Sequence, residues 1–405
     1  MSYYNRHRTD MIKNILNGND LESLIDLDCN DTEAFVHVDD NKDIRDVLEK
    51  KNLDFSSVIN KIGCKLVYIK SGTTGHTFRG FNPENINDPH FAVKIVGYPK
   101  RENYGMYDDV RRPENAELNM LKVLSYFVIN NQTPHLVLPI GTFNTDIKPF
   151  LQLNDQGVVN DKKYNQFVER YKKGELYEKV SILISEWADG GDLLEYIKKN
   201  KDSMTIKEWR VIFFQILSAL SVIQNKYPKF RHNDLKANNI LIQKIGSRNK
   251  NNKFKYKIND KTYIIPNIGI QVKIWDFDFA CIKGLVDNTK VDAKWTDKIN
   301  INSKMNRYYD LHYFFNTLTR KGFFPEFWKS KSVPKAVKEF VRRIIPEKYT
   351  VGENIAERGR ILINDEYTYA DKILKDETPK PGSYRGRINN EPENDRKTLM
   401  ELKNA

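Results

Sequence analysis

The segment RHNDLKANNILI, residues 231–242, constrains this chain more than any other part of its sequence. It places a carboxylate (Asp234), an ammonium group (Lys236) and an amide (Asn239) in one short loop, ahead of an apolar run typical of a β-strand. Phosphoryl transfer to a hydroxyl needs a carboxylate to accept the proton and positive charge to neutralise the moving phosphoryl oxygens. The loop therefore predicts a catalytic base, a phosphate contact and a metal ligand. The alternative is a surface turn, which is common in a chain so rich in Asn and Asp.

The segment VKIWDFDFA, residues 272–280, has the pattern of a buried strand that ends at Asp276. A carboxylate in that position is poorly solvated unless a cation neutralises it, and Mg²⁺ prefers oxygen ligands. We therefore expect Asp276 and Asn239 to hold Mg²⁺ together. Asp276 could instead cap the next turn, but the occurrence of both loops in this order favours the metal site.

A glycine pair lies upstream, in KSGTTGHTF, residues 70–78. Gly72 and Gly75 separate two strand-like runs, and glycines in such a turn let backbone N–H groups approach phosphates closely. Hairpins use the same residues, so the pair alone is weak support. Together with the two loops above, it predicts a turn over the phosphates of ATP.

The apolar run FAVK ends at Lys94, and a lysine in such a strand is rarely buried without a partner. A helical pattern over residues 113–129 offers two carboxylates, of which Glu117 is the natural counter-ion and Glu114 the competing choice. An ion pair with Glu117 would hold Lys94 aimed at the phosphates of ATP.

The pattern along the chain predicts an α+β fold. Strand-like runs begin near residue 58, helical patterns dominate beyond residue 190, and one main helix lies in the β-rich first half. The apolar residues of that helix form one face, which consists of Leu118, Leu121, Val123, Leu124 and Phe127.

In this order, the motifs resemble those of the eukaryotic-type protein kinase superfamily over roughly residues 60–375. The resemblance implies a bilobal fold with an N-terminal extension, a β-rich N-lobe, a mainly helical C-lobe and a flexible tail, at 1–57, 58–188, 189–376 and 377–405. DFDFA, YYDLHYFF and the insertion before the metal loop are most similar to the Ser/Thr kinases of large nucleocytoplasmic DNA viruses, of the poxvirus and giant-virus type.

The resemblance also implies residue roles. SEWADGGDL is similar to the family's hinge, which puts Ser185 at the gatekeeper position, the backbones of Glu186 and Ala188 at adenine and Asp192 at the ribose. RYYDLHYFFNTL resembles the helix whose aspartate, here Asp310, anchors the catalytic loop through backbone N–H groups. An aspartate inside so aromatic a helix must find donors when it is buried.

Four positions depart from the family pattern. Lys70 replaces the first glycine of the phosphate loop, and Asp278 replaces the glycine after Asp-Phe, which predicts a stiffer metal loop. Asn233 replaces the arginine before the base, so we expect activation that does not depend on phosphorylation of the activation segment. The sequence TDK stands where the family usually has Ala-Pro-Glu. The sequence therefore does not predict how the surface that docks a substrate peptide is formed. None of these changes removes a catalytic group.

Composition and charge indicate which binding partners and which cellular compartment to expect. The net charge is +12, but Lys/Asn-rich stretches such as 243–257 carry few stacking aromatic residues, so we expect no specific nucleic-acid binding. Three widely spaced cysteines give no disulfide framework, and no stretch is apolar and long enough to span a membrane. These features predict a cytoplasmic protein, and the viral resemblance implies host cytoplasm or virion.

Three functions compete. A Ser/Thr protein kinase that transfers the γ-phosphate of ATP to protein hydroxyls is preferred, because such kinases keep a lysine two residues after the base and GGDL follows the hinge. A small-molecule kinase similar to choline and aminoglycoside kinases is the alternative, since HND, NIL and DFD resemble that branch too. A pseudokinase scaffold would have lost a catalytic group, yet all of them are present: Lys94, Asp234, Asn239 and Asp276.

Overall fold

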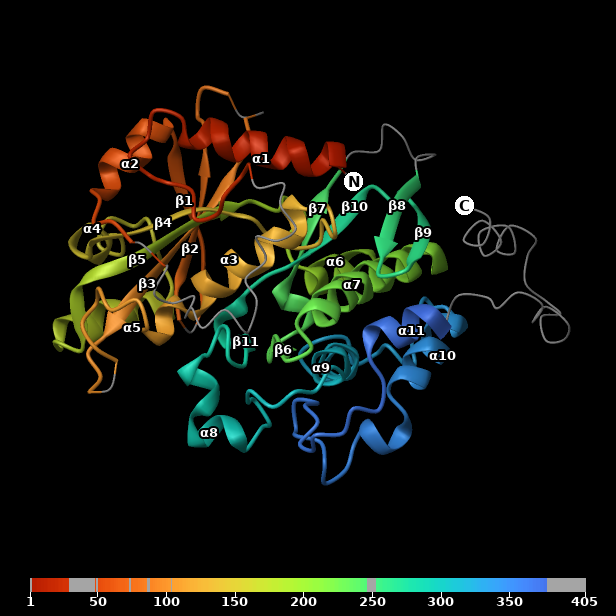
Figure 1. The fold of residues 1–405 in the computed structure, drawn as a ribbon. Helices are drawn as coiled ribbons and strands as arrows, with labels where there is room; N and C mark the ends of the chain where they lie inside the picture. The colour runs from red at the N-terminus through yellow and green to blue at the C-terminus, as the bar shows by residue number, and fades with distance from the viewer. Residues whose placement is uncertain are drawn as a thin grey trace, which may run out of the picture.

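A computed structural model describes the chain over residues 2–28, 48, 50–72, 74–85, 88–102, 104–245 and 253–376. Figure 1 shows a sheet-rich region built from the first part of the chain and a helical region built from the second. The predicted bilobal α+β fold is confirmed. The tail expected at 377–405 and part of the Lys/Asn-rich stretch lie outside the described residues.

A five-stranded antiparallel sheet forms the first lobe, in the order β1-β2-β3-β5-β4. The strands are β1 (Lys65–Ser71), β2 (His76–Phe81), β3 (Phe91–Pro99), β4 (Pro139–Asp146) and β5 (Leu176–Glu186). Lys94 lies in the inner strand β3, opposite Thr77 of β2 and Leu183 of β5. The backbone at Lys94 is therefore held by a neighbouring strand on each side.

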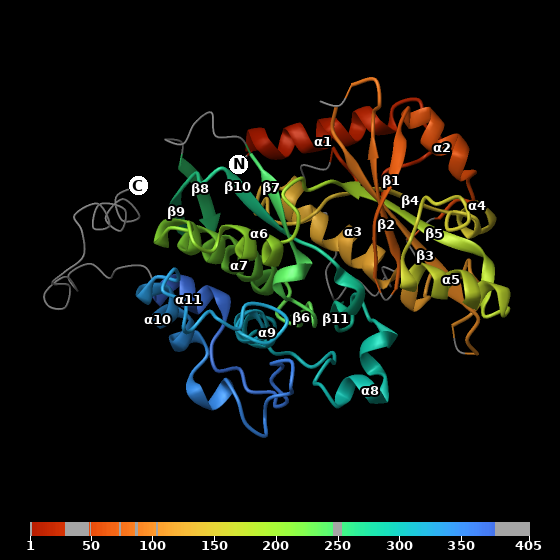
Figure 2. The same cartoon turned by 180° about the vertical axis from the view of Figure 1, so that it is seen from behind.

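The N-terminal segment packs on this lobe wherever the structure describes it. Helix α1 (Ser2–Leu16) contacts α3, and Figures 1 and 2 show it running from the sheet toward β7 and β10. Ser23 and Asn52 form bridges to the edge strand β4. Helix α2 (Phe55–Ile62), capped by Asp54 and ended by Gly63 in the left-handed conformation, crosses the boundary expected at 57–58. The division into extension and N-lobe therefore stays a prediction, and the two parts share one core.

Helix α3 (Ala116–Ile129) is buried on almost every side. The helix itself is confirmed, but the single apolar face predicted for it is too narrow, because Asn119, Met120 and Ser125 are buried as well. Helix α1 supplies part of this cover, and the Asn5 side chain donates to the Val128 carbonyl at 2.9 Å. Because α1 is far from α3 in the sequence, the residue pattern of α3 does not show that α1 covers it. The insertion between β4 and β5 forms two further helices, α4 (Lys148–Leu151) and α5 (Lys162–Lys172).

The second lobe is mainly helical, as predicted. Its longest helix, α7, begins with a capping box in which Thr205 and Glu208 satisfy each other's backbone N–H groups. Every residue of α9 is buried, and Phe213 of α7 packs against Phe315 with ring centroids 4.9 Å apart. The helices are α6 (Leu193–Asn200), α7 (Ile206–Lys226), α8 (Lys294–Asp297), α9 (Tyr309–Leu318), α10 (Lys335–Ile344) and α11 (Ala370–Asp376).

Short antiparallel pairs of strands position the loops with the candidate chemistry. β7 (Ile240–Lys244) pairs with β10 (Ile270–Ile274), and β6 (Phe230–Arg231) pairs with β11 (Cys281–Ile282). The catalytic loop, residues 232–239, therefore connects β6 to β7. The metal loop, residues 275–280, connects β10 to β11. The insertion between them forms the hairpin β8 (Lys253–Ile258) and β9 (Lys261–Pro266), whose Tyr256 and Tyr263 pack on Phe214 of α7.

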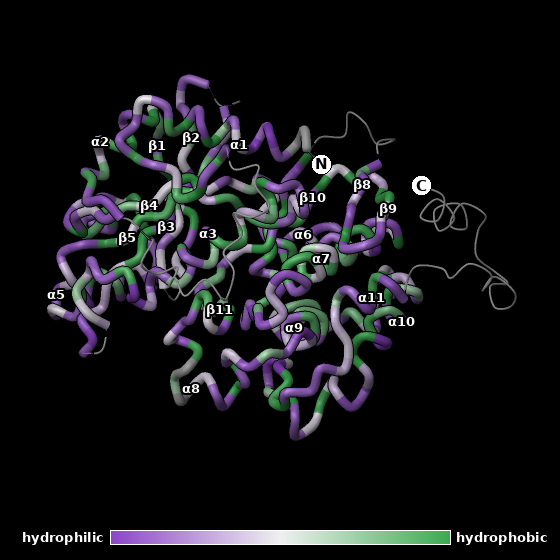
Figure 3. The backbone as a smooth tube through the Cα atoms, in the orientation of Figure 1, coloured by the Kyte–Doolittle hydropathy of each residue, from purple (hydrophilic) through white to green (hydrophobic). Residues whose placement is uncertain are grey.

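One hydrophobic cluster joins both lobes and includes Ile12, Leu21 and Leu24 of the N-terminal segment. Figure 3 shows the hydrophobic stretches concentrated in the strands and inner helices. Within the described residues, no helix has the length and apolar character needed to cross a membrane.

Candidate active site

Lys94 and Glu117 form a buried ion pair between β3 and α3. The Lys94 Nζ lies 2.6 Å from Glu117 Oε2, and both side chains are less than one-tenth exposed. The competing carboxylate, Glu114, is bound instead by Arg112 at 2.9 Å. Burial alone would lower the pKa of Lys94, but Glu117 and the neighbouring carboxylates raise it overall, so the ammonium stays charged.

Gly75 of the glycine pair lies against β3 at Lys94. The Gly72 N–H donates to the Gly75 carbonyl at 2.8 Å and closes the turn between β1 and β2. A Cβ atom on Gly75 would lie 2.9 Å from the Ile95 carbonyl oxygen and 3.3 Å from the Lys94 side chain. Only glycine allows this approach of the turn to β3.

The catalytic loop is fixed from below by α9. Both oxygens of the fully buried Asp310 accept backbone N–H groups, from His232 at 2.7 Å and from Asn233 at 2.8 Å. The anchoring expected for Asp310 is therefore present. Asp234 follows, and its Oδ2 accepts from Lys236 at 2.7 Å and from the Asn239 amide at 3.1 Å. The side chains of the loop thus converge on one carboxylate.

The metal loop brings Asp276 to the same place. Asp276 has φ 65° and ψ 64°, a left-handed conformation that is unusual for a residue other than glycine and that clusters at functional sites. Its Oδ1 lies 3.5 Å from Lys94 Nζ. The Trp275 N–H donates to the Asn239 carbonyl at 3.0 Å, which ties the metal loop to the catalytic loop. Asp278, which replaces the glycine of the family pattern, is bound by Lys290.

Asn233 and Arg231 connect the catalytic loop to the segment that follows the metal loop. The Asn233 amide donates to the carbonyls of Phe279 at 3.0 Å and Asn302 at 3.2 Å. Arg231, fully buried, donates to the Asn300 carbonyl at 2.6 Å. These bonds order the segment without a phosphate group, in line with the expected independence from phosphorylation, which stays a prediction. The contacts of Arg231 could not be predicted from the sequence.

The hinge residues lie at the end of β5 and just beyond it. Ser185 is buried and lies opposite Ala92 of β3. Ala188 follows the strand, and Asp192 caps α6 by accepting the Glu195 N–H at 2.9 Å. The adenine and ribose contacts implied for Glu186, Ala188 and Asp192 stay predictions.

The Glu186 side chain lies in a buried ionic cluster. Arg8 of α1 donates to both of its carboxylate oxygens, at 2.6 Å and 2.7 Å, and Lys273 of β10 lies 3.5 Å away. The same arginine donates to the Leu136 carbonyl at 2.6 Å. The N-terminal helix is therefore joined to the hinge by charge, a contact that the sequence did not suggest.

Ser185→Met should exclude bulky ATP analogues while turnover of ATP itself persists. The short, buried serine lies where the expected adenine would meet β5. A methionine there would occupy the space behind the adenine that a bulky analogue needs. Inhibition by ATP analogues enlarged on the adenine amino group, measured against wild type, checks this prediction. Equal inhibition of both forms would refute it.

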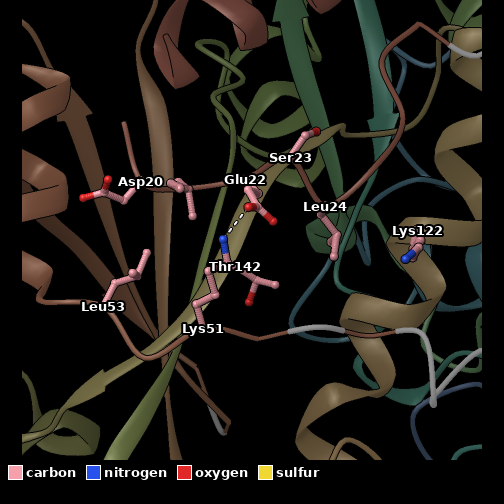
Figure 4. Close-up of a pocket in the computed structure, with 9 residues that line it drawn as sticks. Asp20, Glu22, Ser23, Leu24, Lys51, Leu53, Lys122 and Thr142 are labelled. Atoms are coloured by element: carbon pink, nitrogen blue, oxygen red, sulfur yellow. Dashed lines mark hydrogen bonds and ion pairs between the residues drawn. The ribbon is translucent and has the colours of Figure 1, made fainter. Parts of the chain in front are cut away.

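Among the pockets of the described region, one adjoins the glycine turn and another lies apart from the candidate catalytic side chains. One, of about 590 Å³, opens between the glycine turn, α5 and the segment after the metal loop, and its lining includes Thr74, Phe167, Asp278 and Trp295. The other, of about 250 Å³, lies between the N-terminal segment, β4 and α3. Figure 4 shows it beside Thr142, with the ion pair of Lys51 and Glu22 across it. None of the candidate catalytic side chains lines the second pocket.

Comparison with known proteins gives a family and several viral relatives. The family model described as poxvirus serine/threonine protein kinase matches residues 108–364. A protein of Acanthamoeba polyphaga mimivirus named as serine/threonine-protein kinase R400 is 50% identical over 376 residues, which is 91% of this chain and 78% of the relative. Serine/threonine-protein kinase 2 of fowlpox virus is 28% identical over 60% of this chain and 50% of its own length.

Proposed function

Because this chain belongs to the poxvirus serine/threonine protein kinase family, we propose that it transfers the γ-phosphoryl group of Mg²⁺-bound ATP to protein hydroxyls, with Asp234 as the catalytic base. The chain is a serine/threonine protein kinase. The family match favours protein acceptors over the choline-like alternative, and the complete set of catalytic groups speaks against a scaffold without activity. We also propose that the acceptors are proteins. The proposed location, host cytoplasm or virion, rests on the viral relatives.

One observation carries the assignment of the site. Lys94 Nζ contacts both Glu117 and Asp276, although Lys94 and Asp276 are 182 positions apart in the chain. Three elements, β3, α3 and the metal loop, thus bring their charged side chains to one point. An ammonium group held in this way is suited to the phosphates of a nucleotide.

The oxygen donors fit a magnesium ion. Asn239 uses its amide N–H groups on Asp234, which leaves the amide oxygen for a ligand, and the Asp276 carboxylate is about one-third exposed. Over the part of the chain that the structure describes, no group of three or more His, Cys, Asp or Glu side chains could hold a metal by itself. Mg²⁺ is commonly held by one or two protein oxygens and completes its shell with phosphate oxygens and water. Bound there, it would neutralise charge on the transferring phosphoryl group.

The remaining roles follow from the side chains. Asp234 orients the acceptor hydroxyl and takes its proton as the oxygen attacks phosphorus. The Lys236 ammonium, whose Nζ lies 2.7 Å from Asp234 Oδ2, can contact the phosphoryl oxygens on the side of the acceptor hydroxyl. Glu117 holds the Lys94 ammonium in place, and Gly72 and Gly75 let the backbone of the turn approach the phosphates.

Radiolabelled ATP tests the proposal when it is incubated with the full chain and Mg²⁺ in two separate reactions, one with dephosphorylated casein and one with choline. We expect label on serine or threonine of casein and none after chelation of the metal. Label in choline alone would overturn the choice of acceptor. Label that persists after chelation would overturn the role of Asn239 and Asp276 as metal ligands.

A further inference from the structure

Arg360 lies outside the sequence motifs of the site, yet its side chain reaches the candidate base. Its guanidinium donates to Asp234 Oδ1 and to the Asn233 carbonyl, and to the Tyr309 hydroxyl at 3.1 Å. The Tyr313 ring lies beneath it, with 3.8 Å between the guanidinium carbon and the ring centroid. Arg360 is only 7% exposed. A side chain with this many partners has one orientation.

The backbone around Arg360 is fastened on both sides. The Asn316 amide donates to the Gly359 carbonyl at 3.0 Å, and the Thr317 hydroxyl donates to the Arg358 carbonyl at 3.1 Å, so the loop is held to α9. On the other side, the Asn300 amide donates to the Ile361 carbonyl at 2.9 Å. These three bonds hold the backbone on both sides of Arg360 and so place its side chain next to Asp234.

The contacts of Asp234 define where a substrate can bind. An ionised carboxylate has about four acceptor positions, two on each oxygen. Lys236 and Asn239 occupy both positions of Oδ2, and Arg360 occupies one of Oδ1. Among the donors of the described residues, none takes the second position of Oδ1. An incoming hydroxyl can thus bind there without displacing a partner.

We propose that Arg360 is a positioning residue for phosphoryl transfer, which fixes the Asp234 carboxylate so that the acceptor hydroxyl binds to Oδ1 beside the guanidinium. The inference rests on the proposed role of Asp234. In the step it serves, the acceptor oxygen forms a bond to the γ-phosphorus, the bond from that phosphorus to the β–γ bridging oxygen breaks, and ADP leaves. The hydroxyl proton passes to Asp234.

The charge of Arg360 suits this role. Burial alone would lower the pKa of the guanidinium, but Tyr309, Tyr313 and Asp234 raise it overall. The cation is therefore present at any pH at which the protein is folded. A purely structural role, as a support for the loop on α9, would instead leave the reaction rate unchanged once the variant has folded.

Arg360→Met, Arg360→Lys and Tyr309→Phe separate these roles. A base displaced by about 1 Å can cost on the order of 10²-fold in rate, so Arg360→Met should lower kcat for casein by about that factor. KM for ATP should stay unchanged, because Lys94 and Asp276 are untouched. Arg360→Lys should recover part of the loss, and Tyr309→Phe, which removes one acceptor of the guanidinium, should cause a smaller loss in the same direction.

The unfolding midpoint of each variant is measured alongside, with Asp234→Asn as reference. A kcat within twofold of wild type in folded Arg360→Met overturns the inference, as does a rise in KM for ATP that accounts for the whole loss. Should Arg360→Met not fold, an unchanged kcat in both other variants overturns it. If Asp234→Asn keeps its activity, the proposed function itself fails, so the two failures are distinguishable.

Discussion

Asp234→Asn should lower kcat for phosphoryl transfer to casein by about 10²–10⁴-fold, the usual contribution of a general base. Asparagine keeps the shape of the side chain but cannot take the hydroxyl proton. Its amide nitrogen would also face a donor, either Arg360 on one side or Lys236 on the other. Initial rates with radiolabelled ATP measure the loss. ATP affinity should stay close to wild type, because the Lys94 ion pair and Asp276 are unchanged.

The matched control is Asp260→Asn, the same substitution at an exposed position in the turn between β8 and β9. It should leave kcat within twofold of wild type, since surface substitutions rarely disturb a distant site. A wild-type rate in Asp234→Asn would show that the base lies elsewhere. A phosphosite survey with both forms would then show whether any hydroxyl acceptor depends on Asp234.

The parts of the site that the sequence predicted are those carried by short loops with fixed spacing. Asp234, Lys236 and Asn239 lie so close in the chain that their loop alone brings them together. Asp310 could be predicted for a different reason. The resemblance of its helix to that of the kinase family implied that it anchors the catalytic loop, and the need of a buried carboxylate for donors agrees with the two backbone N–H groups that it accepts.

The choice between Glu117 and Glu114 needed the structure. Both lie near the start of α3 and differ by about one turn, so either could have faced Lys94. Arg112, directly before them, binds Glu114 and leaves Glu117 for the lysine. A sequence pattern predicts the helix but not which of two carboxylates one turn apart faces the lysine.

The arginines that touch the site from far away could not be predicted. Arg360 is 126 positions from Asp234, and Arg8 is 178 positions from Glu186. Each lies in a polar, charged stretch of sequence, where an arginine normally faces solvent. Their burial depends on how a loop packs on α9 and how α1 packs behind the hinge, and no local pattern records either contact.

Arg8→Met is the second substitution with a large expected effect. It should lower the free energy of unfolding by about 3–5 kcal/mol, the usual cost of removing one partner of a buried ion pair. Arg8 and Glu186 are both less than one-tenth exposed. Methionine keeps the length and the packing of the side chain. It leaves the Glu186 carboxylate with Lys273, 3.5 Å away, as its nearest cation among the described residues.

The pKa of Glu186 gives an effect of the same size. Burial, the largest influence, would raise it, but Arg8 and Lys273 lower it from 4.5 to about 2. Because the pKa is lower in the folded state, the carboxylate stabilises the protein above pH 4.5, and this contribution is lost as the pH falls toward 2. The difference corresponds to roughly 3 kcal/mol, since one pKa unit is ~1.4 kcal/mol. Removal of Arg8 should raise the folded-state pKa of Glu186, so the loss of stability between pH 4.5 and 2 should be smaller in Arg8→Met than in the wild type.

Lys13→Met, on the same helix, is the control for denaturant unfolding. Lys13 pairs with Asp28, but their side chains are 42% and 81% exposed, and such pairs contribute about 0–1 kcal/mol. A similar small loss in Arg8→Met would mean that α1 stabilises the lobe through apolar packing alone.

The two substitutions should also differ in their effect on KM for ATP. Glu186 also belongs to the expected adenine hinge, so Arg8→Met should raise KM for ATP, whereas Lys13→Met should not. That pattern would make the N-terminal helix a structural part of the nucleotide site.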